Sequence, residues 1–430
     1  MHLDRFAAAI NARPGELVGL ARAFLCVFCM FSAYSILRPI RETMGITSGV
    51  STLPALFWGT FIVMLAVQPV YGWLTSRFRR STFLPWVYLF FVLNILGFYA
   101  WFNVQADHTW IARVYFVWLS VFNLFVVAVF WSLMADVFDR EQAGRLFGFI
   151  AAGISTGGLF GPFLVQRLAE PIGTINLLPL SAGLLSLSLL LMLGVLRWQR
   201  RVTGGAVAGI DPDAKLGGHS FAAFVQLLRS PYLALIALFV FLLTWISTFL
   251  YLEQQALVAQ VFPDRDAQTA FFSRIDFWVQ AGSLLIQLFL FGRLYRWLGF
   301  RALIVSIPLL MMLGFATLAL FPTFAVLVGV MVIRRIGEYS ITRPSRDTLY
   351  TVVTREEKYK AKSLIDTFVY RGGDATSASA HTIVKATFDL GLSGVAWCGA
   401  ALAAIWALVA LRLGREHVAR RSAASPAGRD

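Results

Sequence analysis

A twelve-residue stretch occurs twice in this sequence. Residues 33–44 read Ala-Tyr-Ser-Ile-Leu-Arg-Pro-Ile-Arg-Glu-Thr-Met and residues 338–349 read Glu-Tyr-Ser-Ile-Thr-Arg-Pro-Ser-Arg-Asp-Thr-Leu, with seven identical positions. Each copy places two arginines and one carboxylate next to an apolar segment. Guanidinium groups grip phosphate or carboxylate oxygens in pairs and stay charged when buried, so the pattern indicates an anion as ligand. The alternative is two helix ends that share a proline stop and an aqueous flank.

Further charged side chains interrupt apolar segments elsewhere. An arginine at the centre of a membrane helix costs about 2.5–3.5 kcal/mol, so such residues indicate function or pairing. Arg334 and Glu338 are four residues apart and Arg371 and Asp374 three apart, so pairing within a helix is available to both. We predict that the solute is bound by Arg38, Arg41, Glu42, Glu253, Arg334, Arg335 and Glu338. The predicted gate or coupling residues are Asp136, Arg343, Arg346, Lys362, Asp366, Arg371 and Asp374.

The composition is that of a helical membrane protein. Hydrophobic residues make up 58% of 430 positions and charged residues 14%, with a mean hydropathy of +0.71. Apolar runs of about 20 residues recur, which is the length that crosses a bilayer as a helix. The net charge of +14 is spread over short loops between these runs, so we expect no nucleic-acid partner. Because the three cysteines fall inside apolar runs, we expect no zinc site, and no metal or cofactor.

Twelve spans are predicted, in two bundles of six. The domains are 1–197 for the first bundle, 198–230 for a cytoplasmic linker, 231–412 for the second bundle and 413–430 for a basic tail. One set of alternate loops, with the termini, holds 25 of the 37 lysines and arginines, which places both termini in the cytoplasm. Gly153, Gly157 and Gly161 recur at four-residue spacing, which predicts close helix packing.

Two loops carry a family resemblance. Gly72-Trp-Leu-Thr-Ser-Arg77 after the second span and Gly292-Arg-Leu-Tyr-Arg296 after the eighth resemble the G-x-L-x-D-R-x-G-R-R loop of the major facilitator superfamily, without its Asp. The resemblance implies the major facilitator fold, an all-α membrane protein with two pseudo-symmetric six-helix bundles. In that fold spans one, four, seven and ten line the central path. The two copies of the repeated stretch would then form an outer and an inner gate.

Four further stretches resemble the ATP/ADP translocase (nucleotide transporter) family. They are Leu37-Arg-Pro-Ile-Arg-Glu-Thr-Met44, Phe130-Trp131 with Arg145-Leu-Phe-Gly148, Tyr251-Leu-Glu253, and Arg343-Pro-Ser-Arg-Asp-Thr-Leu-Tyr350 with Lys358-Tyr-Lys360-Ala-Lys362-Ser-Leu-Ile-Asp366. The resemblance implies that Arg41, Glu253 and a lysine of the 360–362 pair matter for nucleotide exchange. The chain departs from that family at Arg41, where a lysine is expected, and at residues 117–123, which lack an acidic residue.

These observations predict a secondary transporter of a bacterial inner membrane. We expect it to move a small anionic solute, phosphate-bearing or nucleotide-like, by alternating access, as a monomer without enzymatic activity. Exchange against a counter-anion and coupling to a proton both stay open. The alternatives are a proton-coupled transporter of uncharged or cationic compounds, a lipid flippase of the same fold, and a non-transporting sensor. The chain has no G-x-x-x-x-G-K-[ST] loop, which argues against direct use of ATP.

Overall fold

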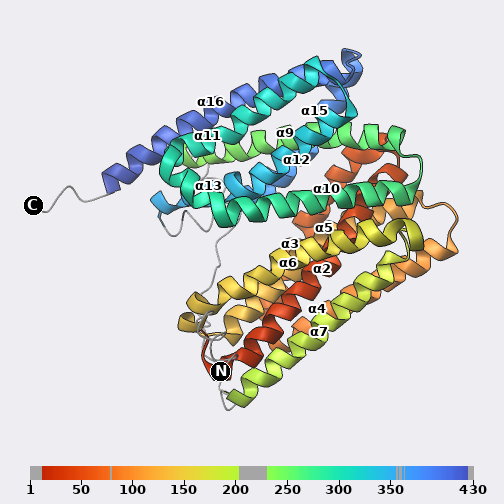
Figure 1. The fold of residues 1–430 in the computed structure, drawn as a ribbon, viewed down its shortest axis with the longest axis vertical. Helices are drawn as coiled ribbons and strands as arrows, with labels where there is room; N and C mark the ends of the chain where they lie inside the picture. The colour runs from red at the N-terminus through yellow and green to blue at the C-terminus, as the bar shows by residue number, and fades with distance from the viewer. Residues whose placement is uncertain are drawn as a thin grey trace, which may run out of the picture. The chain divides into compact units, whose positions relative to one another are not determined.

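The computed structural model describes residues 12–77, 80–202, 230–354, 357, 361–362 and 364–424. Helices make up nearly all of this part of the chain, and it contains no β-strand (Figure 1). The predicted all-α class is therefore confirmed. Most of the predicted linker (203–229), the end of the tail (425–430) and Lys360 lie outside the described residues.

The first half of the chain forms six long helices. They are α2 (Leu17–Thr47), α3 (Leu53–Arg77), α4 (Arg80–Val104), α5 (Thr109–Val137), α6 (Arg140–Ile172) and α7 (Leu177–Val202), with the short 3₁₀ turns η1 (Pro14–Glu16) and η2 (Val50–Thr52). Each predicted span of this half falls on one of them. Apolar runs of this length satisfy their backbone polar groups only by helix formation when water is absent.

Helix α2 continues through the whole first copy of the repeated stretch, to Thr47. Pro39 lies inside it, so the interpretation of the first repeat as a proline stop is wrong. The Thr43 hydroxyl donates to the Pro39 carbonyl at 3.2 Å, and the Tyr115 hydroxyl donates to the Leu37 carbonyl at 3.2 Å. Membrane helices tolerate proline where side chains from the same or neighbouring helices bond the backbone in this way.

The second half contains helices interrupted by π-helical turns. Its elements are α9 (Pro231–Val261), α10 (Arg265–Leu285), η3 (Ile286–Leu290), α11 (Phe291–Leu320), α12 (Phe324–Gly337), η4 (Glu338–Thr342), α13 (Arg343–Leu349), η5 (Tyr350–Val352), η6 (Ile365–Val369), α15 (Tyr370–Thr387) and α16 (Leu392–Ala424). Of these, η3, η4 and η6 are π-helical. π-helical turns are frequent at functional sites, and η4 begins at Glu338, one of the predicted solute-binding residues.

Nine helices within the described residues are long and apolar enough to cross a membrane. The longest covers Arg265–Leu320 and contains a break at Gly299, whose φ of +72° is unfavourable for residues with a Cβ. Helix α12 is only 14 residues long, and α15 carries several charged or titratable side chains. Such helices need shielding by their neighbours. The count of twelve spans stays a prediction.

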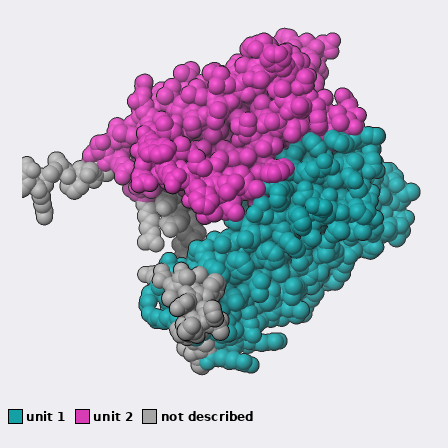
Figure 2. All heavy atoms as spheres, viewed as in Figure 1, with its two compact units in different colours: residues 1–49, 66–215, 262–277 teal, residues 50–65, 216–261, 278–430 magenta. Residues whose placement is uncertain are grey.

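The described chain divides into two compact units (Figure 2). Unit 1 contains residues 1–49, 66–215 and 262–277, and unit 2 contains residues 50–65, 216–261 and 278–430. Each unit is therefore mostly one half of the chain, with the start of α3 in unit 2 and the start of α10 in unit 1. These two segments occupy the second and eighth predicted spans, the positions that parallel repeats would make equivalent.

Unit 1 is built around α2, which packs against α5, α6 and α7. The contact with α6 is close, because Gly153, Gly157 and Gly161 face the backbone of α2. A Cβ added at Gly157 would lie 2.5 Å from the carbonyl oxygen of Phe28. The predicted close packing by small residues is confirmed. Such packing fixes where α2 presents its charged residues.

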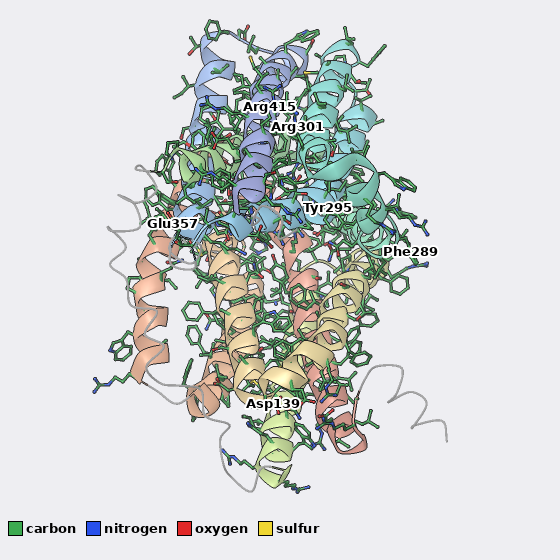
Figure 3. The ribbon with its side chains drawn as sticks, turned by 90° about the vertical axis from the view of Figure 1, so that its left-hand side faces the viewer. Asp139, Phe289, Tyr295, Arg301, Glu357 and Arg415 are labelled. Carbon is green, nitrogen blue, oxygen red and sulfur yellow. The ribbon has the colours of Figure 1, made fainter. Side chains whose placement is uncertain are left out.

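Unit 2 is built around α9, α11 and α16. Helices α11 and α16 pack against each other, and Figure 3 labels Arg301 and Arg415 on them. Helix α16 continues to Ala424, and His417 near its end is buried and bonds to the hydroxyl of Tyr232 at 3.1 Å. The Tyr232 hydroxyl also donates to the carbonyl of Leu349 at 2.9 Å, which joins α16, α9 and the end of α13.

The same kind of reciprocal bonding occurs twice, ahead of the fifth and of the eleventh predicted span. In the first, the Gln142 amide N–H donates to Asp139 Oδ1 at 2.8 Å and the Asp139 amide N–H to Gln142 Oε1 at 3.1 Å. In the second, the Glu357 amide N–H donates to Thr354 Oγ1 at 3.3 Å and the Thr354 amide N–H to Glu357 Oε2 at 3.0 Å. This reciprocal bonding marks a helix N-terminus, and its recurrence fits two parallel repeats.

Candidate functional site

Arg41 is held by α5 and by its own helix. Its guanidinium carbon lies 3.7 Å from the centroid of the Phe116 ring, and its Nε donates to the Phe116 carbonyl at 3.2 Å. Its Nη1 also pairs with Glu42 Oε1 at 3.2 Å. A stacked, carbonyl-bonded guanidinium is fixed in position, because its planar fork satisfies several acceptors at once. Arg41 is therefore well placed to hold α2 against α5.

Arg38 faces a different helix of unit 1. Its Nε lies 3.7 Å from Asp276 Oδ2 on α10, and the side chain of Arg38 is 26% exposed while that of Asp276 is 5% exposed. Thr43, one turn further along α2, bonds to Thr269 of α10 at 2.7 Å. The start of α10 is thus bonded to the charged end of α2. Asp276 is not among the residues predicted for the site.

Arg334, Arg335 and Glu338 are all buried in unit 2. Arg334 Nη1 donates to Glu338 Oε2 at 2.6 Å and to Ser247 Oγ of α9 at 2.6 Å. The predicted pairing of Arg334 with Glu338 is confirmed. The three side chains bring two guanidinium groups and one carboxylate into the interior of unit 2, where charge is costly unless it is paired.

Glu338 also connects α12 with the helix that follows η6. The hydroxyl of Tyr370 donates to Glu338 Oε1 at 3.5 Å. Asp374, one turn further on α15, lies 3.6 Å from Arg371 Nη1 and accepts from the Thr248 hydroxyl at 3.4 Å. The predicted Arg371–Asp374 pair is confirmed, and it borders the same part of α9 as Ser247.

Glu253 is bonded to two side chains of α15. His381 Nε2 lies 2.8 Å and Lys385 Nζ 2.7 Å from the same oxygen, Glu253 Oε1. The residues predicted for the site include neither His381 nor Lys385. Their spacing of four residues, which puts both on one helix face, was the available signal.

The remaining predicted gate residues of unit 2 form two ion pairs and a ring contact. Arg346 Nη2 lies 3.2 Å from Asp366 Oδ1, and Lys362 Nζ lies 2.8 Å from Asp347 Oδ1. The guanidinium carbon of Arg343 lies 5.1 Å from the centroid of the Tyr339 ring. The second copy of the repeated stretch is thus tied to the segment that precedes α15.

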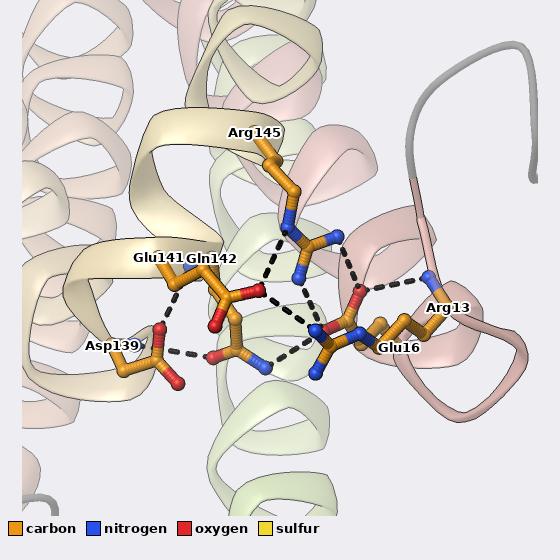
Figure 4. A network of polar contacts seen from close by, with 6 residues as sticks. All are labelled: Arg13, Glu16, Asp139, Glu141, Gln142 and Arg145. Atoms are coloured by element: carbon orange, nitrogen blue, oxygen red, sulfur yellow. Dashed lines mark hydrogen bonds and ion pairs between the residues drawn. The ribbon is translucent and has the colours of Figure 1, made fainter.

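Asp136, another predicted gate or coupling residue, lies on α5 in unit 1. Its carbonyl accepts from Gln199 Nε2 at 3.1 Å. Near this end of unit 1 lies a different polar network, centred on Glu16 (Figure 4). Glu16 accepts from Arg145 at 3.0 and 3.3 Å and from the side chain of Gln142 at 3.0 Å.

The Glu16 network connects the chain before α2 with the start of α6. Burial acts to raise the pKa of Glu16, but hydrogen bonds from Arg145, the Arg13 amide and Gln142 lower it below its ordinary value. Glu141 adds a second carboxylate, 2.7 Å from Arg13 Nη2 (Figure 4). Within the described residues no group of His, Cys, Asp and Glu could hold a metal ion.

Comparison with known proteins points to transport. Residues 20–377 match the Major Facilitator Superfamily. The chain is 21% identical to ADP,ATP carrier protein 2 of Chlamydia pneumoniae, over 92% of this chain and 88% of that protein. It is 33% identical to the hexuronate transporter of Bacillus subtilis, but over only 20% of each chain.

Solved transporter structures share the fold. A nucleoside transporter, NupG, superposes with a TM-score of 0.64 at 13% identity and covers 94% of this chain and 99% of its own. PepTSo, a POT family transporter, superposes with a TM-score of 0.67 at 12% identity, over 93% of this chain and 98% of its own. These likenesses concern the fold, and they agree with a chain that crosses the membrane many times.

Proposed function

Since this chain belongs to the Major Facilitator Superfamily, a family of membrane transporters, we propose that it moves a small anionic solute by alternating access. The observation that carries the proposal is the buried group of Arg334, Arg335 and Glu338. It brings two guanidinium groups together inside unit 2, and one of them also bonds to the hydroxyl of Ser247. A bound anion would accept bidentate hydrogen bonds from such groups.

The solute class follows from the same chemistry. Phosphate and carboxylate oxygens both fit a guanidinium fork. Similarity to ADP,ATP carriers over most of the chain favours a nucleotide or another phosphate-bearing solute. The shorter similarity to a hexuronate transporter favours a sugar acid as the second candidate. Both solutes are anions, so both use the same arginines.

The roles of the other charged residues differ between the units. Arg38, with its partly exposed side chain, is the residue of the first copy that is best placed to meet the solute, whereas Arg41 and Glu42 position α2. The pairs Arg346–Asp366 and Lys362–Asp347 would open and close one end of unit 2 as a gate. We place this gate on the cytoplasmic side of a bacterial inner membrane, with both termini in the cytoplasm, because lysines and arginines concentrate there.

Thermal stabilisation of the purified protein tests the anion site. The panel contains ATP, ADP, AMP, glucuronate, uridine and anionic lipid. A ligand of the native state adds about 2.7 kcal/mol of stability at a hundredfold excess over its Kd. We expect a shift with ATP, ADP or glucuronate and none with uridine, and we expect the double substitution Arg334→Gln with Arg335→Gln to remove it.

Uptake into proteoliposomes completes the test. The double variant should insert normally and lose uptake of the stabilising anion, while Arg296→Gln, an exposed arginine of α11, should keep it. Full uptake by the double variant would refute the anion site. A shift with uridine or with lipid alone would instead favour transport of an uncharged compound or movement of lipid.

A further inference from the structure

Glu253, His381 and Lys385 form a buried ionisable group that anion binding does not explain. Glu253 is 4% exposed and His381 is 6% exposed. The ring nitrogen Nε2 of His381 and the ammonium nitrogen of Lys385 bond to the same oxygen, Glu253 Oε1. The Phe249 ring meets the His381 ring edge to face at 5.1 Å. The side chain of Lys385 is 37% exposed, so one member of the group reaches the surface of the unit.

An ion pair that only joins two helices would need fewer ionisable groups than these three. Lys385 alone would neutralise Glu253, and one hydrogen bond to the carboxylate would suffice to join α9 and α15. Those helices are joined elsewhere, because Ser377 donates to the Trp245 carbonyl at 3.3 Å and Thr248 to Asp374 at 3.4 Å. A histidine is the side chain whose protonation changes near neutral pH. Its bond to a buried carboxylate gives a proton two adjacent acceptors.

Other charged groups reach α9 from the elements packed against it. Helix α15 also brings Asp374 to Thr248, and α12 brings Arg334 to Ser247. Element η6 carries Asp366, which pairs with Arg346, and α16 brings His417 to Tyr232. The turn η2 carries no ionisable residue. Among the described residues, the side chains of His381 and Lys385 bond to the Glu253 carboxylate.

The same helix joins this group to the proposed solute site. Ser247, which accepts from Arg334, lies six residues before Glu253 on α9. At a rise of 1.5 Å per residue this separation is about 9 Å along the helix. Helix α9 therefore carries both Glu253 and the residue that bonds to Arg334, about two turns apart.

We propose that Glu253, His381 and Lys385 bind a proton that accompanies the solute. With Glu253 ionised and Lys385 charged, the group is neutral. One proton from the outer side, taken up between the carboxylate and the imidazole, leaves a net charge of +1. Entry of an anion together with this proton moves less net negative charge across the membrane than entry of the anion alone. Coupling of this proton to a solute rests on the proposed function, but proton binding itself requires no solute.

A pH jump without solute tests the inference. Proteoliposomes adsorbed on a solid-supported membrane report charge movement when the outer pH is changed. We expect a transient current from the unmodified protein, and less than a tenth of it from Glu253→Gln. The matched control is Glu170→Gln, an exposed carboxylate at the end of α6, which should keep the full current. Lys385→Gln should move the half-maximal current to higher pH by about one unit or more, because a cation beside a carboxylate favours ionisation.

The outcomes separate the two proposals. Equal currents from the unmodified protein, Glu253→Gln and His381→Gln, or no current from the unmodified protein, would overturn the proton site. Either result leaves anion binding by Arg334 and Arg335 to be judged by stabilisation. If Glu253→Gln does not fold, His381→Gln serves in its place, because it removes the second acceptor and leaves the Glu253–Lys385 pair intact. Loss of its current would then support the inference.

Discussion

The two copies of the repeated stretch differ most in charge, at the first position of the stretch and in the residues just before it. In unit 2 the positions at and just before the repeat hold Arg334, Arg335 and Glu338. The equivalent positions in unit 1, found by the same offset along the chain, hold Cys29, Met30 and Ala33. Both sets are buried, but only one is charged. The repeat alone therefore does not distinguish the two units, and the proposed solute site is placed at the charged group that only the second copy has beside it.

The copies also differ in helix geometry and in their partners. Residues Tyr34 to Ile36 lie in regular α-helix, whereas the matching Tyr339 to Ile341 lie in the π-helical turn η4. In unit 1 the stretch is held by α5 and α10 through Phe116 and Asp276. In unit 2 it is held by the segment before α15. The same local sequence thus adopts two conformations because different neighbours hold it.

The largest expected effect is at Arg334. Arg334→Gln leaves Glu338 buried without its main partner, and breaking a buried pair from one side costs about 3–5 kcal/mol. Unfolding in detergent by denaturant measures the loss. The matched control is Cys29→Ala at the equivalent position of unit 1, which should cost about 1 kcal/mol, typical of a single substitution.

The double substitution Arg334→Gln with Glu338→Gln sharpens this result. It removes both charges, so most of the stability should return, since exchange of a whole buried pair is often close to neutral. An equal loss in the single and the double variant would mean that packing, and not charge, holds α12. The contrast between the two copies would then lose its basis.

A smaller loss is expected at Asp276. Asp276→Asn removes the negative charge that faces Arg38, but the separation of 3.7 Å and the partial exposure of Arg38 reduce the cost to about 2 kcal/mol. Denaturant unfolding of the two single variants and of Asp276→Asn with Arg38→Gln gives the coupling energy. Coupling near zero would show that the two groups are neighbours without interaction.

At Asp366 we expect a substitution to lower the free energy of unfolding by about 1 kcal/mol, which is the upper end for partly exposed ion pairs. Asp366→Asn weakens the contact with Arg346, whose side chain is 11% exposed while that of Asp366 is 33% exposed. Transport should change more than stability, because a gate pair breaks and re-forms in each cycle. Unfolding and uptake measured on the same preparation separate the two effects. Lost stability with unchanged uptake would exclude a gate role.

Much of the fold was predictable because it depends on local patterns. Apolar length predicts membrane helices, and four-residue spacing predicts both the Arg334–Glu338 pair and the glycine contact of α6 with α2. What failed depends on distant residues. The partners of Arg38 and Glu253 lie 238 and 128 residues away, and no local rule connects them. The π-helical turn at Glu338 was missed because its sequence nearly repeats that of a regular helix.

The smallest effect is expected at Lys362. Its pair with Asp347 is short, 2.8 Å, but the two side chains are 38% and 51% exposed. Water and salt screen such a pair, so Lys362→Gln should change the free energy of unfolding by no more than about 0.5 kcal/mol. In 1 M salt, where the screening length is about 3 Å, the difference should vanish, whereas the loss from Asp276→Asn should persist. A larger, salt-resistant loss at Lys362 would mean that the second copy is held by buried charge as the first is.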